Sequence, residues 1–244
     1  MKEMGQDSDY LSFLESRRQE ILSCVADACA RSGREAGEVE LIAVSKTVGP
    51  DEVELAWRAG WRSFGENRPQ ELKRKLEGLA GRGDVAGARF DMIGNLQVNK
   101  INQVLGNVRL IHSVSSVHLA EAISKRAQVR DMVASVLVEV NVSGEESKSG
   151  LSPKEAKAEF EALLGLPGID VCGLMTMAPK GDAARTRSTF AGLHELRDDL
   201  AGEYGVPLEV LSCGMSDDFQ IAIEEGSTLV RLGRCVFDPS YVLQ

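Results

Sequence analysis

A regular alternation of short apolar segments with longer segments of helical pattern constrains the fold more than any other feature of this chain. Eight candidate strands occur along the 244 residues, and helical segments separate nearly all of them. The candidate strands span residues 39–45, 62–65, 89–93, 108–114, 134–142, 169–176, 208–214 and 227–233. Eight such units in a chain of this length predict an α/β fold, a single (β/α)8 barrel of the TIM type.

The segments between the strands carry helix boundaries, and one further helix precedes the first strand. Residues 9–32 place apolar side chains near helical spacing. Pro50 and Pro153 stand where first helical residues are expected, and Ser115 or Ser116 is the expected cap of the helix after the fourth strand. The tail after the last strand is short. We therefore expect either that the N-terminal helix fills the gap in the ring of helices or that the barrel is irregular there.

The domain organisation follows from the absence of any repeat, linker or low-complexity tract in the sequence. We expect one domain over residues 1–244, in which residues 1–38 form the N-terminal helix and the lead-in to the barrel. A doubly wound sheet is the alternative. That fold usually shows a glycine fingerprint after its first strand, and the sequence AVSKTVGP does not match one.

Composition argues against several classes of function. The chain has 28 basic and 37 acidic residues and a net charge of −9, which disfavours nucleic-acid binding. The cationic stretch NRPQELKRK is expected to be a solvated helix face. No apolar run reaches the roughly 18 residues of a membrane helix, and the N-terminus lacks the pattern of a signal peptide, so we expect no membrane contact and a cytoplasmic location. The five cysteines form no CxxC pair and the three histidines show no zinc spacing, which predicts buried free thiols and no metal site.

A lysine, Lys46, directly follows the first apolar strand, at the edge where (β/α)8 barrels place their active face. A lysine at this position could simply extend past the strand end into solvent. Because its side chain starts in the barrel mouth, we expect partial desolvation to lower the pKa of the amine. A neutral amine forms a Schiff base with an aldehyde, so Lys46 is a candidate for capturing an aldehyde-bearing ligand.

The loops after the last two strands predict an anion site. Gly214 and Gly233 allow close approach to the backbone, and Ser216 is expected to cap a helix starting at Asp217 and to leave free N–H groups there. Barrel enzymes often bind a phosphate between these two loops. We expect Asp217 and Asp218 to point away from the anion. An aldehyde-capturing lysine opposite a phosphate site predicts pyridoxal 5'-phosphate as the ligand.

Seven motifs occur in a fixed order along the chain. They are AVSKT (43–47), FGEN (64–67), IGNLQVNK (93–100), EVNVSGEESKSGL (139–151), GLMTMAP (173–179), GMSDDFQIAIEEGST (214–228) and VRLG (230–233). In this combination the chain resembles the pyridoxal 5'-phosphate homeostasis protein family over roughly residues 39–237. The resemblance implies a fold-type-III barrel similar to the N-terminal domain of alanine racemase.

The resemblance also implies a role for individual residues. Lys46 would carry the cofactor as a Schiff base, Asn67 would line the pocket beside it, and Arg231 would face the pyridine nitrogen. The phosphate would be held by Met215, Ser216, Gly233 and the backbone at Arg234. Without the family match, Arg231 could equally form a salt bridge to Glu66 or Glu139.

Several positions depart from the family pattern. They are Arg68, Pro69, Asp91, Arg234, Cys235 and Asp238. Asp91 stands where the family commonly has histidine, and Arg68 stands where it commonly has an aromatic residue. At Arg234 a guanidinium stands close to the place of a usual hydroxyl, which changes the chemistry offered to a phosphate.

The implied function is binding and buffering of the cofactor without established catalytic turnover, in vitamin B6 and amino- and keto-acid homeostasis. Apo forms of enzymes that depend on this cofactor are candidate recipients, and the chain is expected to be a monomer or a weak homodimer. A small racemase dependent on pyridoxal phosphate is the alternative, and a Schiff-base aldolase is a third possibility. Racemisation needs a second base, and none of Tyr10, Tyr204 and Tyr241 is expected at the end of a strand. Arg231 cannot keep the ring nitrogen protonated, which weakens the cofactor as an electron sink.

Overall fold

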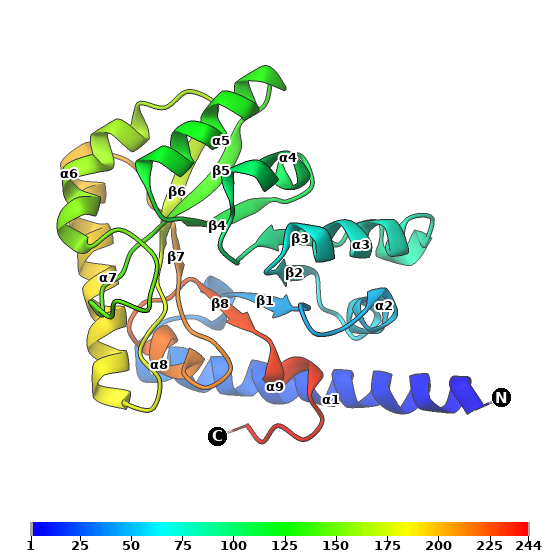
Figure 1. The fold of residues 1–244 in the computed structure, drawn as a ribbon. Coiled ribbons are helices and arrows are strands. Elements are labelled where there is room, and N and C mark those ends of the chain that lie inside the picture. The colour runs from blue at the N-terminus through cyan, green and yellow to red at the C-terminus, as the bar shows by residue number, and fades with distance from the viewer. Residues whose placement is uncertain (1, 244) are drawn as a thin grey trace.

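The computed structural model describes residues 2–243 and forms a closed barrel of eight parallel strands (Figure 1). The strands are β1 (Glu40–Val44), β2 (Ser63–Glu66), β3 (Arg89–Met92), β4 (Leu110–Val114), β5 (Ala134–Glu139), β6 (Ile169–Met175), β7 (Val210–Ser212) and β8 (Leu229–Leu232). Each strand pairs with the next along the chain, and β8 pairs with β1 to close the barrel. The predicted (β/α)8 barrel is therefore confirmed.

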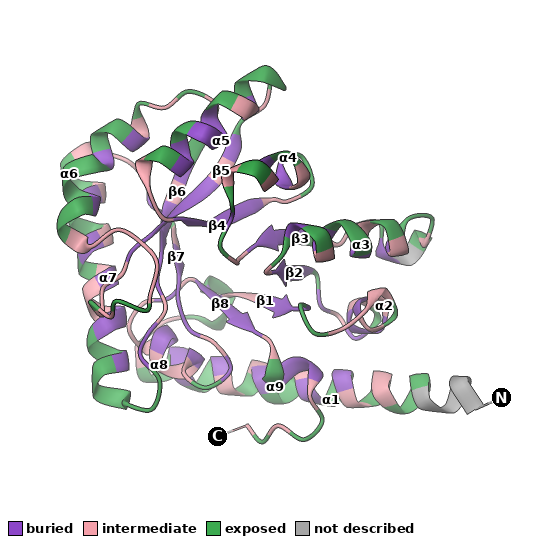
Figure 2. Cartoon of the chain, viewed as in Figure 1, coloured by how far each residue is buried: buried purple, intermediate pink, exposed green. Residues whose placement is uncertain are grey.

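Helices surround the barrel, and their exposed outer faces contrast with the buried strands (Figure 2). They are α1 (Lys2–Arg31), α2 (Pro50–Arg58), α3 (Pro69–Leu79), α4 (Ile101–Val104), α5 (Val117–Val129), α6 (Pro153–Leu164), α7 (Ala183–Tyr204), α8 (Phe219–Glu224) and α9 (Arg234–Phe237). Short 3-10 helices span Ala36–Glu38, Gly83–Val85 and Val98–Lys100. The Ser116 hydroxyl accepts the N–H of Leu119 and so caps α5, and Pro153 begins α6 as predicted. No helix within the described residues has the length and apolar character needed to cross a membrane.

The gap after β8 is filled by the N-terminal helix, which is one of the two arrangements expected. Helix α1 packs against α2, α8 and α9, and lies along the last two of these in Figure 1. Leu14, Ile21 and Val25 on its inner face are buried. The helix begins at Lys2, well before the predicted start at residue 9. The prediction missed the first turns because they lack the apolar repeat on which it rested.

The barrel interior is apolar in part and polar in part. Successive strand residues point to opposite faces, so alternate positions fill the interior. The apolar interior positions are Ile42, Val44, Leu110, Leu137, Met175 and Leu229. Barrel strands also carry buried polar side chains, among them Asp91, His112, Ser212 and Arg231. These polar groups sit below the mouth, which the loops at the C-terminal ends of the strands surround.

Candidate functional site at the barrel mouth

Lys46 lies in the turn that follows β1, two residues beyond the end of the strand. Ile42 and Val44, the alternate residues before it in β1, face the barrel interior. The residue is exposed, and within the described part of the chain its amine forms no hydrogen bond or ion pair. The predicted desolvation of this side chain is therefore wrong, because the turn carries it out of the barrel into water. The result is a primary amine that is accessible and unpaired.

The turn after β8 lies directly beside the end of β1. Ala43 is the register partner of Leu232, and a Cβ placed on Gly233 would lie 3.5 Å from the Val44 Cβ. Lys46 follows Val44 by two residues. The structure thus brings Lys46 and Gly233 to one side of the mouth, although nearly 190 residues separate them in sequence.

The loop after β7 differs from the prediction. Helix α8 begins at Phe219, and Ser216 does not cap it. The Ser216 hydroxyl instead accepts the N–H groups of Gly233 (3.3 Å) and Cys235 (3.2 Å), so it caps α9. Asp218 does not point away from the loop either, because its Oδ1 accepts the N–H of Met215 at 2.6 Å. The reason is closure of the barrel, which places the first N–H groups of α9 within reach of Ser216.

Arg234 and Tyr241 enclose the other side of this loop. The exposed guanidinium of Arg234 is ion-paired with Asp217. The hydroxyl of Tyr241 lies 2.8 Å from the Ser216 carbonyl oxygen and 2.9 Å from Asp217 Oδ1. Tyr241 lies in the tail, outside any strand, yet its hydroxyl reaches the loop after β7. Burial, followed by the hydrogen bond to Asp217, raises the pKa of Tyr241, so its hydroxyl stays protonated.

Arg231 is held inside the barrel by oxygen atoms other than carboxylates. One terminal nitrogen of its guanidinium donates to the Ser212 carbonyl (2.8 Å) and the Ser212 hydroxyl (2.5 Å), and the other donates to the Thr176 carbonyl (3.1 Å). The residue is 4% exposed, and burial lowers its pKa. The alternative salt bridge to Glu66 or Glu139 does not form. Arg231 is therefore a fixed donor below the mouth.

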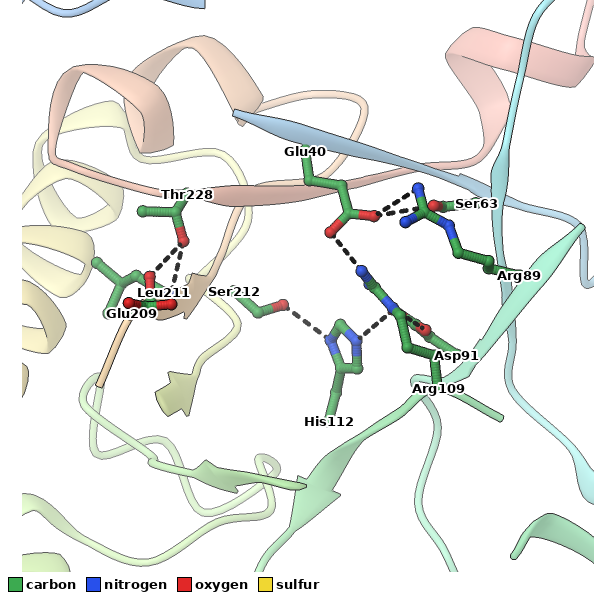
Figure 3. A network of polar contacts seen from close by, with 10 residues as sticks. All are labelled: Glu40, Ser63, Arg89, Asp91, Arg109, His112, Glu209, Leu211, Ser212 and Thr228. Atoms are coloured by element: carbon green, nitrogen blue, oxygen red, sulfur yellow. Dashed lines mark hydrogen bonds and ion pairs between the residues drawn. The ribbon is translucent and has the colours of Figure 1, made fainter. Parts of the chain in front are cut away.

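A buried polar network extends from Ser212 toward the other end of the barrel (Figure 3). The His112 ring bridges the Ser212 hydroxyl (3.0 Å to Nδ1) and Asp91 (3.1 Å to Nε2). Asp91 accepts two further hydrogen bonds from Arg109, at 3.1 and 2.7 Å. Arg109 also donates to Glu40 at 2.7 Å, at the start of β1. Sequence reasoning noted Asp91 only as a departure from the family pattern and assigned His112 no partner.

Burial sets the charge of this network. Burial alone would raise the pKa of Asp91, but hydrogen bonds from His112 and Arg109 outweigh it and hold that pKa below its ordinary value. Burial lowers the pKa of His112, so the ring is neutral. A neutral ring has one donor and one acceptor nitrogen. Since Asp91 is ionised, Nε2 carries the proton, and Nδ1 accepts from Ser212.

A second set of buried polar side chains, Lys75, Glu66 and Ser45, lies next to the end of β1. Lys75 of α3 is fully buried with its Nζ 2.6 Å from Glu66 Oε1, and the Ser45 hydroxyl donates to the same oxygen at 2.6 Å. The prediction of a solvated helix face is therefore wrong for Lys75, although Lys73 beside it is exposed. These contacts hold the chain one residue before Lys46.

The opposite side of the mouth contains a cavity of about 590 Å³. Its walls come from the segments that follow β2, β3 and β6 and from the end of β5, and they include Asn67 and Glu139. Asn67 Oδ1 and Glu139 Oε2 are both buried without a hydrogen-bond partner in the described part of the chain. Lys46 and Arg231 do not line this cavity. Sequence reasoning considered Glu139 only as a salt-bridge partner, although its place at the end of a strand was a usable signal.

Comparison with known proteins identifies the family. A family model described as the N-terminal domain of alanine racemase matches residues 25–240. A relative from Aquifex aeolicus, named pyridoxal phosphate homeostasis protein, is 43% identical over 222 residues, which cover 91% of this chain and 96% of the relative.

Solved structures agree with this match. PipY of Synechococcus elongatus PCC7942, solved with pyridoxal phosphate bound, has a TM-score of 0.81 at 31% identity. The match covers 92% of this chain and 99% of the PipY chain. An alanine racemase from Clostridium difficile 630 has a TM-score of 0.71 at 19% identity over 97% of this chain and 59% of that one, which shows a common fold. The chain therefore belongs to the pyridoxal phosphate homeostasis protein family.

Proposed function

We propose that this chain binds pyridoxal 5'-phosphate and buffers or delivers it, in vitamin B6 and amino- and keto-acid homeostasis, without catalytic turnover. The observation that carries the proposal is the unpaired amine of Lys46 at the mouth, beside the Gly233 turn. PipY, a structural neighbour at 31% identity over nearly its whole length, was solved with this cofactor bound. A primary amine is the group that captures an aldehyde.

The other residues named from the sequence fit the cofactor to different degrees. Arg231 presents a fixed cation below the mouth. Asn67 directly follows β2, which pairs with β1 at the residues just before Lys46. The N–H groups of Gly233 and Met215 are already bound to Ser216 and Asp218. A phosphate would have to replace these internal contacts and would meet the Asp218 carboxylate. When bound, the cofactor supplies an electrophilic aldehyde and an electron-withdrawing ring.

The proposal of no turnover rests on what surrounds the mouth. Arg231 is a permanent donor and offers the ring nitrogen no anion to keep it protonated. The hydroxyl of Tyr241 keeps its proton. Burial raises the pKa of Tyr10 to about 12, and the Tyr10 hydroxyl donates to the Phe237 carbonyl. A racemase needs a base on each face of its substrate. The small-racemase alternative is therefore less well supported than binding.

The exposure of Lys46 supports a role in delivery, since a cofactor held there would be open to other amines. We propose apo forms of pyridoxal-phosphate enzymes as recipients. All five cysteines are free thiols, three buried and two half-buried, which suits the cytoplasmic location that remains our prediction. The monomeric or weakly dimeric state also remains a prediction.

Chemical trapping tests the proposal. Purified protein mixed with the cofactor should gain a visible absorbance band, and borohydride should then fix the label on the peptide that contains Lys46. Lys46→Ala should lose both signals, whereas Lys73→Ala, which removes an exposed lysine of α3, should keep them. A label on another lysine, or equal labelling of both variants, would refute the assignment.

A transfer experiment tests delivery separately. The loaded protein is mixed with an apo-enzyme, and recovery of that enzyme's activity is followed with time. Delivery requires recovery faster than release of free cofactor from the loaded protein. Recovery at the rate of release would leave buffering as the function and reject delivery.

A further inference from the structure

The mouth of the barrel has two halves with different chemistry. Lys46, Gly233 and the loop after β7 form the half to which we assign the cofactor. The cavity of about 590 Å³ occupies the other half, and of the residues assigned to the cofactor only Asn67 lines it. A cavity of this size is within the range that small-molecule ligands occupy.

Glu139 supplies a buried acceptor that has no partner in the described part of the chain. The residue is 1% exposed, its Oε1 accepts the Ser149 hydroxyl at 2.6 Å, and its Oε2 accepts nothing. The segment above it fixes its position, because the Leu151 N–H donates to the Glu139 carbonyl at 2.9 Å. Gly150, at φ +111°, passes so close that a Cβ would lie 2.8 Å from that carbonyl oxygen. Glu139 therefore lines the cavity from a fixed backbone, with one carboxylate oxygen buried and unpartnered among the described residues.

Asn67, in the segment that follows β2, supplies a second acceptor in the lining of this cavity. Its Oδ1 is buried without a hydrogen bond, and its backbone is packed against Gly94, where a Cβ would lie 2.3 Å from the Asn67 carbonyl oxygen. Buried acceptors in folded proteins are rarely left unpaired, because the loss of hydration is costly. Two unpartnered acceptors in the lining of one cavity, one of them a carboxylate, favour a ligand with a protonated amine.

The rim of the cavity carries the opposite charge. Arg68 is exposed and Lys100 half-buried, and neither forms an ion pair or hydrogen bond among the residues that the structure describes. Unpaired guanidinium and ammonium groups favour a carboxylate. Ile93 and Met177 add apolar surface to the lining of the cavity.

We infer that this cavity is a binding site for a free α-amino acid with an aliphatic side chain. Its ammonium group would donate to Glu139 and Asn67, and its carboxylate would face Arg68 and Lys100. The physiological role of the site rests on the proposed function. Asn67 and Lys46 follow the ends of the paired strands β2 and β1, so a bound amino acid would stand beside the cofactor and link its retention to amino-acid supply.

Calorimetric titration of the full-length, cofactor-free protein with three ligands tests the site. L-leucine has both charged groups, 4-methylpentanoate lacks the amine, and 3-methylbutylamine lacks the carboxylate. We expect saturable binding of L-leucine and, for each analogue, affinity weaker by about tenfold or more. The inference is overturned if L-leucine does not bind, or if either analogue binds as tightly as L-leucine.

Two pairs of variants locate the site. Glu139→Gln should weaken L-leucine binding by about tenfold, and Glu77→Gln, which changes an exposed glutamate of α3, should not. Arg68→Gln should weaken binding by a few-fold, and Arg58→Gln, at an exposed arginine outside the cavity, should not. If circular dichroism shows that Glu139→Gln does not fold, the Arg68 pair and the ligand series decide the question. Equal affinity of Arg68→Gln and Arg58→Gln overturns the site as placed.

The two proposals fail in distinguishable ways. Labelling of Lys46 by cofactor and borohydride is measured on the same protein without L-leucine. Loss of labelling with intact L-leucine binding rejects the cofactor proposal alone. Intact labelling without L-leucine binding rejects the amino-acid site alone.

Discussion

The buried Asp91 is the residue whose replacement tests the polar network most directly. Asp91→Asn keeps the shape of the side chain but removes the charge that pairs with Arg109 and His112. An amide has one acceptor oxygen, so it cannot accept all three hydrogen bonds that the carboxylate accepts from these two residues. Its N–H groups would also face the donor atoms that now point at Asp91.

The expected loss of stability follows from burial. Breaking a buried ion pair by changing one partner costs about 3–5 kcal/mol. Here the cost is smaller, because the Arg109 side chain is 33% exposed and keeps Glu40 as a partner. We expect a loss of about 2–3 kcal/mol, which for a chain of this length lowers Tm by roughly 5–10 °C.

The assay is urea unfolding at neutral pH, with calorimetry for Tm. Asp27→Asn, at an exposed aspartate of α1, serves as the control and should change stability by less than about 0.5 kcal/mol. A double-mutant cycle with Arg109→Gln should give a coupling energy of about 1 kcal/mol or more. If Asp91→Asn matches the control, or if the cycle is additive, the reasoning about this network is refuted.

The pH dependence gives an independent check with a definite sign. The pKa of Asp91 is lower in the folded protein than the unfolded value of about 3.9. Its contribution to stability is therefore complete above about pH 4 and is lost as the pH falls through the folded pKa. The difference in stability between wild type and Asp91→Asn should be constant near neutrality and shrink in acid. A difference that grows below pH 4 would contradict the direction of the shift.

Two further variants test the contacts around the mouth. Lys75→Ala leaves Glu66 buried without its cation, so we expect a loss of about 3–5 kcal/mol in urea unfolding. Lys73→Ala on the exposed face of α3 should cost less than about 0.5 kcal/mol, and equal losses would show that the buried pair has no special role. Ser216→Ala removes the cap of α9 and should cost about 1 kcal/mol. A stability equal to wild type would contradict the capping role of this hydroxyl.

The barrel itself could be predicted because its determinants are local. Each strand reads as a short apolar run, and several helices begin at a recognisable residue such as Ser116 or Pro153. These signals depend on neighbours a few residues away, so they are visible without the fold. The same applies to Lys46, which follows the first strand directly.

The partners of buried polar side chains were decided only by the tertiary structure. His112 meets Asp91 and Ser212, which are 21 and 100 residues away, and Lys75 turns inward to meet Glu66. Ser216 lies where a cap of α8 is expected, yet barrel closure brings the start of α9 to its hydroxyl. The physical reason is that periodicity reports which face of an element is apolar, whereas strand register and barrel closure determine which polar atoms meet inside it.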